Sequence, residues 1–159
     1  VQLLTVERNI CLVNLDAVAA GAVVSSARER KHALEYIGKL SIATPSPDTE
    51  VQYLSGGNQQ KVVISKWLLR DCDVLIFDEP TRGIDVGAKY EIYELILQLA
   101  KQGKAVMMVS SEMPELIGIC DRILVMSNGH MAGILERGKD FGGIENEQET
   151  IMRLAAQYV

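Results

Sequence analysis

The sequence predicts an α/β fold in which a helical part precedes a layer of strands and helices. Two apolar runs, at residues 74–77 and 105–109, flank a segment with helical periodicity. This order of strand, helix and strand favours a parallel crossover. Later in the chain, Asn128-Gly129 lies between two further apolar runs and predicts a β-hairpin, because both turn positions tolerate a positive φ. With 159 residues, 48% of them hydrophobic, the chain can form a core.

The first part of the chain is predicted to be helical. Residues 28–40 place apolar side chains on one helical face, at Ala33, Leu34, Ile37 and Leu40. Residues 41–50 contain Pro45 and Pro47 and predict a loop. A second helix is predicted to follow Gly57 and to run to Arg70, because apolar residues recur at steps of three and four, at Val63, Ile64, Trp67 and Leu68.

The second part alternates strands and helices. The continuous apolar run at residues 74–77 predicts a strand that is covered on both faces. The helix of the crossover is expected to begin near Asp85 and to end before Gly103, with a core face formed by Ile92, Leu95, Ile96 and Leu99. A last helix is predicted to place one apolar face on the core, made by Ile151, Leu154, Ala155 and Tyr158.

Composition excludes several classes of function. The net charge of -5 argues against a broad nucleic-acid interface, since such interfaces cluster Lys and Arg. The cysteines are odd in number and widely spaced, at Cys11, Cys72 and Cys120, which favours neither a disulfide framework nor a zinc site and fits a reducing cytoplasm. The longest apolar run, residues 17–24, is too short to cross a bilayer, so a membrane role would come through a partner.

A glycine pair after a serine is the first candidate for chemistry. Gly56 and Gly57 at a helix start let backbone N–H groups approach an anion, and the hydroxyl of Ser55 adds a donor. The alternative for such a tripeptide is a flexible turn before a helix.

Two acidic residues at the end of a buried strand are the second candidate. Asp78 and Glu79 follow the apolar run, at the strand end where α/β sheets place ligand groups. Asp78 would hold the shell of a magnesium ion, and Glu79 would orient or deprotonate an attacking water. The alternative is a solvated pair of acids in a loop.

Taken together, these segments resemble the ATP-binding cassette family. Residues 54–58 match its signature motif, residues 74–79 its Walker B motif, and residues 83–85 the loop that crosses the dimer interface. Residues 5–10 resemble the stretch after the glutamine loop. The resemblance implies a P-loop NTPase-like partial domain: a helical signature subdomain at residues 1–70, then the C-terminal part of a RecA-like core at residues 71–159, with a terminal hairpin and helix. The glycine-rich phosphate loop of the family, its Walker A motif, does not precede these motifs here.

Residues 54–61 and 79–89 resemble, more narrowly, the second cassette of importers for monosaccharides such as galactose or ribose. ATP and Mg²⁺ are the cofactors that this resemblance implies. It assigns catalysis to Glu79 and a water-mediated magnesium contact to Asp78. The residues that it places against nucleotide are Leu54, Ser55, Gly56, Gly57, Asn58, Asp85 and Ser111.

The resemblance also implies partners. Two cassettes of the family share each ATP site, so the expected partners are a first cassette in the same polypeptide, transmembrane permease subunits and, indirectly, a periplasmic sugar-binding protein. The expected location is cytoplasmic, peripheral on the inner face of the cell membrane, without nucleic acid. ATP hydrolysis is expected from the complete pair, whereas the chain alone is expected to be inactive.

Ser111 lies where the switch loop of the family usually has a histidine. A serine hydroxyl can donate one hydrogen bond but cannot carry a positive charge. An alternative role for Ser111 is the N-cap of the helix that begins near Pro114. His32 and His130 are poor substitutes, because one lies in a predicted amphipathic helix and the other after the Asn-Gly turn.

Three competing interpretations stay open. Residues 133–139 have the spacing of a phosphate loop, but Asp140 stands where a hydroxyl should reach magnesium. A DNA-linked cassette ATPase would also pair a signature with Walker B, although no long heptad arm is present in this sequence. The chain would otherwise be a regulatory or assembly module that binds no nucleotide productively.

Overall fold

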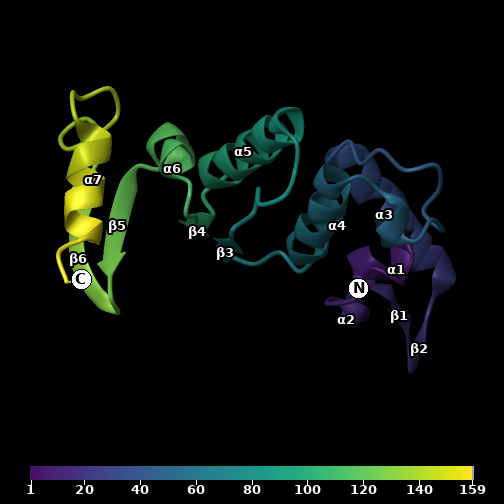
Figure 1. Ribbon diagram of the computed structural model, residues 1–159. Coiled ribbons are helices and arrows are strands. Elements are labelled where there is room, and N and C mark those ends of the chain that lie inside the picture. Colours follow the sequence, from purple (N-terminus) through teal and green to yellow (C-terminus); the bar gives the residue numbers. More distant parts are fainter. Residues whose placement is uncertain (159) are drawn as a thin grey trace. The chain divides into compact units, whose positions relative to one another are not determined.

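The computed structural model describes residues 1–158 and divides the chain into two compact units, Val1–Met107 and Met108–Val159 (Figure 1). The predicted division at residue 70 is a different partition and stays a prediction. The helices of the first unit are α1 (Val6–Cys11), α2 (Leu15–Val18), α3 (Ser26–Lys39), the short 3-10 helix η1 (Val51–Tyr53), α4 (Gly56–Leu69) and α5 (Val86–Lys101). Its strands are β1 (Ala19–Ala20), β2 (Val23–Val24), β3 (Val74–Asp78) and the beginning of β4 (Ala105–Val109).

Helices α1, α3 and α4 pack around one apolar core, which confirms the two helices predicted before residue 70. The packed face of α4 differs from the predicted one, because Val63 is 40% exposed and Trp67 is 45% exposed. Of the predicted residues, Ile64 is buried and Leu68 packs against the core, as expected. The buried side chains of α4 are Lys61, Val62, Ile64, Ser65 and Leu69. Periodicity therefore located the helix, but it did not identify which of its sides the other helices cover.

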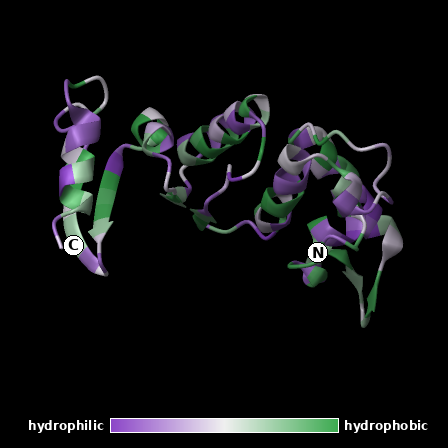
Figure 2. Ribbon diagram, viewed as in Figure 1, coloured by the Kyte–Doolittle hydropathy of each residue, from purple (hydrophilic) through white to green (hydrophobic). Residues whose placement is uncertain are grey.

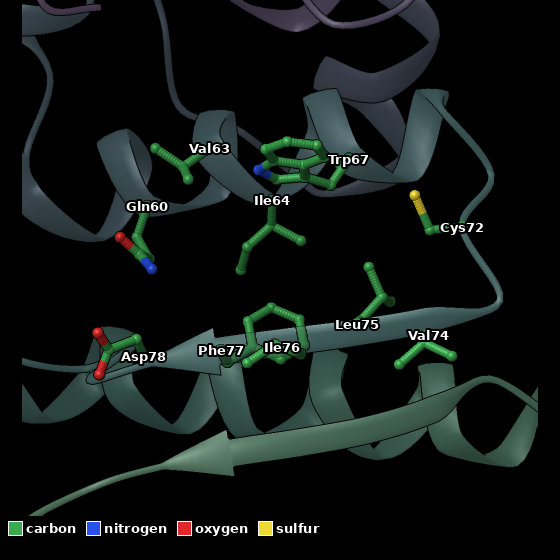
Figure 3. Close-up of a pocket in the computed structure, with 10 residues that line it drawn as sticks. All are labelled: Gln60, Val63, Ile64, Trp67, Cys72, Val74, Leu75, Ile76, Phe77 and Asp78. Atoms are coloured by element: carbon green, nitrogen blue, oxygen red, sulfur yellow. The ribbon is translucent and has the colours of Figure 1, made fainter.

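Strands β3 and β4 are neighbours in one sheet, and the backbone N–H of Ala105 donates to the carbonyl of Asp73 over 2.9 Å. Both arrows point the same way in Figure 3, so the predicted parallel crossover is confirmed. Helix α5 makes the connection. Its N-cap is Asp85, which accepts a hydrogen bond from the N–H of Ala88 over 2.9 Å, and Gly103 follows its end with a φ of 88°.

The two faces of β3 differ in exposure. Leu75 and Phe77 are buried, whereas Val74 is 62% exposed and Ile76 is 65% exposed. The prediction that both faces of this strand are covered is therefore wrong for residues 1–158. A continuous apolar run shows only that both faces can be buried, and here the described residues bury one of them.

The second unit contains α6 (Met113–Ile119), β5 (Arg122–Ser127), β6 (His130–Glu136) and α7 (Glu147–Ala155). Strands β5 and β6 form the predicted hairpin, in which Asn128 has a φ of 46° and Gly129 a φ of 80°. Figure 2 shows apolar residues along β5. Helix α7 packs on the hairpin through Ile151, Leu154 and Ala155, as predicted, while Tyr158 lies beyond the end of this helix.

The phosphate-loop spacing at residues 133–139 has no functional counterpart in the structure. Gly133 lies within β6, and Asp140 accepts a hydrogen bond from the backbone N–H of Glu136 at the end of that strand over 2.9 Å. A phosphate loop must join a strand to a following helix, so this interpretation is excluded. Among residues 1–158, no helix is long and apolar enough to cross a membrane.

The side chain of Glu147 fixes the approach to α7, and this contact predicts a dependence of stability on pH. Its carboxylate accepts hydrogen bonds from Gly143 over 3.0 Å and from Gly142 over 2.7 Å, and these bonds lower the pKa of Glu147 below its ordinary 4.5. Because the pKa is lower in the folded state, the contact stabilises the protein above pH 4.5 and is lost as pH falls through the folded-state value. We expect Glu147→Gln to lower the free energy of unfolding at neutral pH and to have a much smaller effect at about pH 3.

Urea denaturation at the two pH values measures this difference. Glu149→Gln is the matched control, since Glu149 lies in the same first turn of α7 and its loss removes the same charge. An equal destabilisation by both variants would show that the charge near the helix start matters, and that the bonds to the two glycines do not.

Candidate functional site

The start of α4 leaves its first N–H groups available to a ligand. Ser55 occupies the N-cap position with extended backbone angles, but its side chain makes no capping hydrogen bond, and the side chain is exposed. The helix begins at Gly56 and is 14 residues long. A helix N-terminus with uncapped N–H groups and a nearby hydroxyl favours an anion such as a phosphate.

The two glycines pack closely against the first turn of α5 and the loop before it. A Cβ atom on Gly57 would lie 2.6 Å from the Cβ of Ala88, and one on Gly56 would lie 3.1 Å from the Cγ2 of Ile84. The first distance is far below van der Waals contact, so only glycine fits at position 57. The structure thus brings the start of α4 together with the loop that contains Asp85.

A buried lysine adds a second link between α4 and α5. Lys61 is 8% exposed, and its Nζ lies 2.7 Å from Oε2 of Glu91 and 3.2 Å from the carbonyl oxygen of Ser41. Residues four apart share a helical face, so Lys61 lies on the same side of α4 as Gly57. Sequence reasoning missed this ion pair, although the same spacing would have placed Lys61 beside the glycine pair.

Asp78 ends β3 with an exposed side chain, and the next residue has an unusual backbone. Glu79 has a φ of 46°, in the left-handed region that favours glycine. The following Pro80 and Thr81 are fully buried, and the N–H of Arg82 donates to the carbonyl of Glu79 over 3.2 Å. Such a backbone costs about 1–3 kcal/mol and persists only when its surroundings hold it, as commonly happens at active sites.

A groove lies between α4 and β3, within the first unit. Its volume is about 360 Å³, and most of its lining is apolar. Gln60 of α4 and Asp78 of β3 lie at the same end of the groove (Figure 3). Asp78, the candidate magnesium contact, therefore adjoins an open space next to the helix that carries the glycine pair.

The donor set at Asp78 fits a magnesium ion of the kind that nucleotides carry. The described residues contain no group of three or more His, Cys, Asp or Glu side chains that would enclose a metal ion. Mg²⁺ needs no such cage, because it commonly binds through one or two carboxylates and keeps waters and phosphate oxygens as its other ligands. An exposed carboxylate at a strand end meets this requirement.

Ser111 belongs to the second unit and follows β4. The N-cap of α6 is Glu112, whose backbone N–H donates to the hydroxyl oxygen of Ser110 over 3.0 Å. The hydroxyl of Ser110 donates in turn to the buried carboxylate of Glu115 over 3.0 Å. The alternative role of Ser111 as an N-cap is therefore wrong, because Glu112 is the N-cap residue and Ser110 makes the hydrogen bonds at the helix start. Ser111 stays a candidate for nucleotide contact.

The remaining candidates occupy different environments. Leu54 is 8% exposed and belongs to the core of the helical part, so its side chain packs inward. Asn58 is half-buried and hydrogen-bonded to Ser55. His32 lies on α3, 3.7 Å from Glu35, and the ring of His130 packs on that of Tyr158.

The strand, helix and strand order, with a glycine-pair helix and an acidic strand end, defines a partial nucleotide-binding cassette. A solved ATP-binding cassette dimer, in a post-hydrolysis state with ADP and phosphate, superposes with a TM-score of 0.70 at 26% identity, over 87% of this chain and 59% of that chain. A nucleotide-free cassette gives a TM-score of 0.75 over 95% of this chain, at 18% identity. The ABC transporter family profile matches residues 1–82, and the chain belongs to this family.

Curated relatives resemble nearly the whole chain. The galactose/methyl galactoside import ATP-binding protein of Clostridium perfringens is 50% identical over 98% of this chain, and that of Clostridium tetani is 52% identical over the same share. The Haemophilus influenzae protein of the same name is 48% identical. The chain spans 29% to 30% of the length of these relatives.

Proposed function

We propose that this chain supplies the signature motif of an ATP site that it shares with a second cassette, in an assembly that powers sugar uptake. The observation that carries the proposal is the uncapped start of α4, whose glycines pack onto the loop before α5 and the first turn of α5. Support for a sugar as the transported substrate comes from relatives named as galactose/methyl galactoside import proteins.

The start of α4 would contact the nucleotide bound by the other cassette. The hydroxyl of Ser55 and the N–H groups of Gly56 and Gly57 suit the oxygens of a γ-phosphate, because fixed donors at a helix start need no rearrangement to meet an anion. Asp85, the N-cap of α5, would lie at the interface between the two cassettes. The cassette opposite would supply the phosphate loop.

Asp78 and Glu79 would serve the other site of the pair. Asp78 would hold magnesium through water, and the ion would supply charge neutralisation on the phosphates. Glu79 would orient the attacking water and accept its proton. The turn at Glu79 favours this role, since its left-handed backbone is held by buried neighbours. Ser111 would contact the γ-phosphate as a weaker substitute for histidine.

The proposed partners follow from these roles in the two shared ATP sites. A first cassette in the same polypeptide would complete both sites, and permease subunits would receive the motion that ATP binding drives. A periplasmic sugar-binding protein would act through the permease. In this arrangement the chain would lie in the cytoplasm, peripheral on the inner face of the membrane.

Equilibrium ATP binding and turnover, measured on the chain alone and after addition of a cassette with a phosphate loop, test the proposal. We expect background turnover from the chain alone and a clear increase with the second cassette, because each site needs groups from both. Turnover by the chain alone that Glu79→Gln abolishes would overturn the proposal. Glu94→Gln, an exposed carboxylate on α5, is the control and should leave the turnover of the pair unchanged.

A further inference from the structure

The side chain of Asn58 joins two segments at the start of α4. Its Oδ1 accepts a hydrogen bond from the backbone N–H of Ala43 over 2.8 Å, and its Nδ2 donates to the Oγ of Ser55 over 2.8 Å. Ala43 lies in the loop of residues 41–50, and Ser55 precedes the glycine pair. Both polar ends of the amide are thus engaged within the chain.

The loop that presents Ala43 is anchored on both sides. Lys61 donates to the carbonyl of Ser41 over 3.2 Å, and Arg30 contacts both carboxylate oxygens of Asp48, over 3.0 Å and 2.9 Å. The hydrogen bonds from Arg30 lower the pKa of Asp48 below its ordinary value. The N–H of Ala43 is therefore a donor in a fixed position.

The direction of the bond between Asn58 and Ser55 follows from this geometry. A backbone N–H can only donate, so the atom of Asn58 that faces Ala43 must be the carbonyl oxygen. The amide nitrogen then faces Ser55, and it can only donate as well. The hydroxyl oxygen of Ser55 is consequently the acceptor.

An accepted hydrogen bond leaves the hydroxyl proton of Ser55 for another partner. A serine hydroxyl has one proton and two lone pairs, and Asn58 occupies one lone pair. Ser55 is exposed and makes no capping bond to α4, so its proton can point toward a bound anion. Hydrogen bonds that are linked in series strengthen one another, so the bond from Asn58 makes the hydroxyl of Ser55 a better donor.

We propose that Asn58 is a positioning residue that holds Ser55 as a donor to the phosphate of the bound nucleotide. The proposal rests on the proposed function, since it concerns the same shared ATP site. Asn58 acts through Ser55, and the hydrogen bond from Ala43 sets the orientation of Asn58.

Asn58→Asp in the assembled transporter separates this role from a structural one. The aspartate has the same shape and still accepts from Ala43, so the melting temperature should stay near that of the wild type. It would accept from Ser55, however, and would turn the hydroxyl proton away from the phosphate. We expect kcat for ATP to fall about tenfold, the loss typical of one hydrogen bond to a charged group.

The same substitution in a Ser55→Ala background distinguishes orientation from simple charge repulsion. If Asn58 acts through Ser55, Asn58→Asp should have little further effect there. An undiminished tenfold loss in that background, or no loss in the wild-type background, would overturn the proposal while leaving the shared site intact. A Ser55→Ala variant with full activity would instead overturn the proposed function on which the inference rests.

Discussion

Replacing Gly57 with alanine is expected to lower the free energy of unfolding by about 1–3 kcal/mol, the range for overpacking a close contact. The added methyl group would lie 2.6 Å from the Cβ of Ala88, and neither group can rotate away, because each is attached directly to a helix backbone. Alanine favours helix over glycine by about 1 kcal/mol, which offsets only part of this loss. Chemical denaturation measures the stability, and ATP turnover of the assembled transporter should fall with it, since α4 must shift.

Two variants control this result. Gly38→Ala, in α3, makes the same change where no atom lies within 4 Å, and it should be neutral or stabilising. Ala88→Gly in the Gly57→Ala background moves the methyl group from one helix to the other and should restore much of the stability. A double variant as unstable as the sum of both single variants would contradict the packing argument and would assign the glycine to backbone conformation instead.

Local patterns in the sequence predicted the elements well, because each signal concerns neighbouring residues. The period of α5, its cap at Asp85 and the glycine at 103 define one helix without reference to the rest of the fold. Asn128-Gly129 likewise predicted its turn, since two successive positive φ angles are required there. The glycine pair also marked the beginning of α4, which starts at Gly56.

Contacts between distant residues were not predictable in this way. The pairing of Lys61 with Glu91 depends on how α4 and α5 cross, and the bond from Ala43 to Asn58 depends on the path of a loop. The exposure of Ile76 depends on which segments cover the sheet. The left-handed backbone of Glu79 was not predictable either, because a residue before proline is biased toward extended angles and not toward a positive φ.

These distant contacts change how the candidate site is interpreted. The sequence suggested phosphate binding or a flexible turn for the glycine pair, whereas the structure shows that Gly57 also permits the close approach of Ala88. The start of α4 and the loop containing Asp85 are consequently packed as one piece. A change in either segment should therefore affect the other. The effect of a substitution at Ser55 must for this reason be compared with that of a matched control variant.

Ser55→Arg is expected to reduce ATP turnover of the assembled transporter by about 100-fold, comparable to the loss of a fixed donor at a reacting anion. The arginine removes the hydroxyl and fills the space before the first turn of α4, where a phosphate would bind. Ser111→Ala should cost only about fivefold, the worth of one ordinary hydrogen bond, because serine already lacks the charge of a switch histidine. Steady-state turnover in one membrane preparation measures both losses.

Ser25→Arg provides the matched control for the first substitution. Ser25 is the N-cap of α3, a helix of 14 residues like α4, and it also makes no side-chain capping bond. The same bulk and charge at this helix start should leave turnover unchanged, since no glycine pair follows it. Equal losses from Ser55→Arg and Ser111→Ala would contradict the proposed asymmetry, because the site completed by the start of α4 would then contribute no more than the site that contains Asp78 and Glu79.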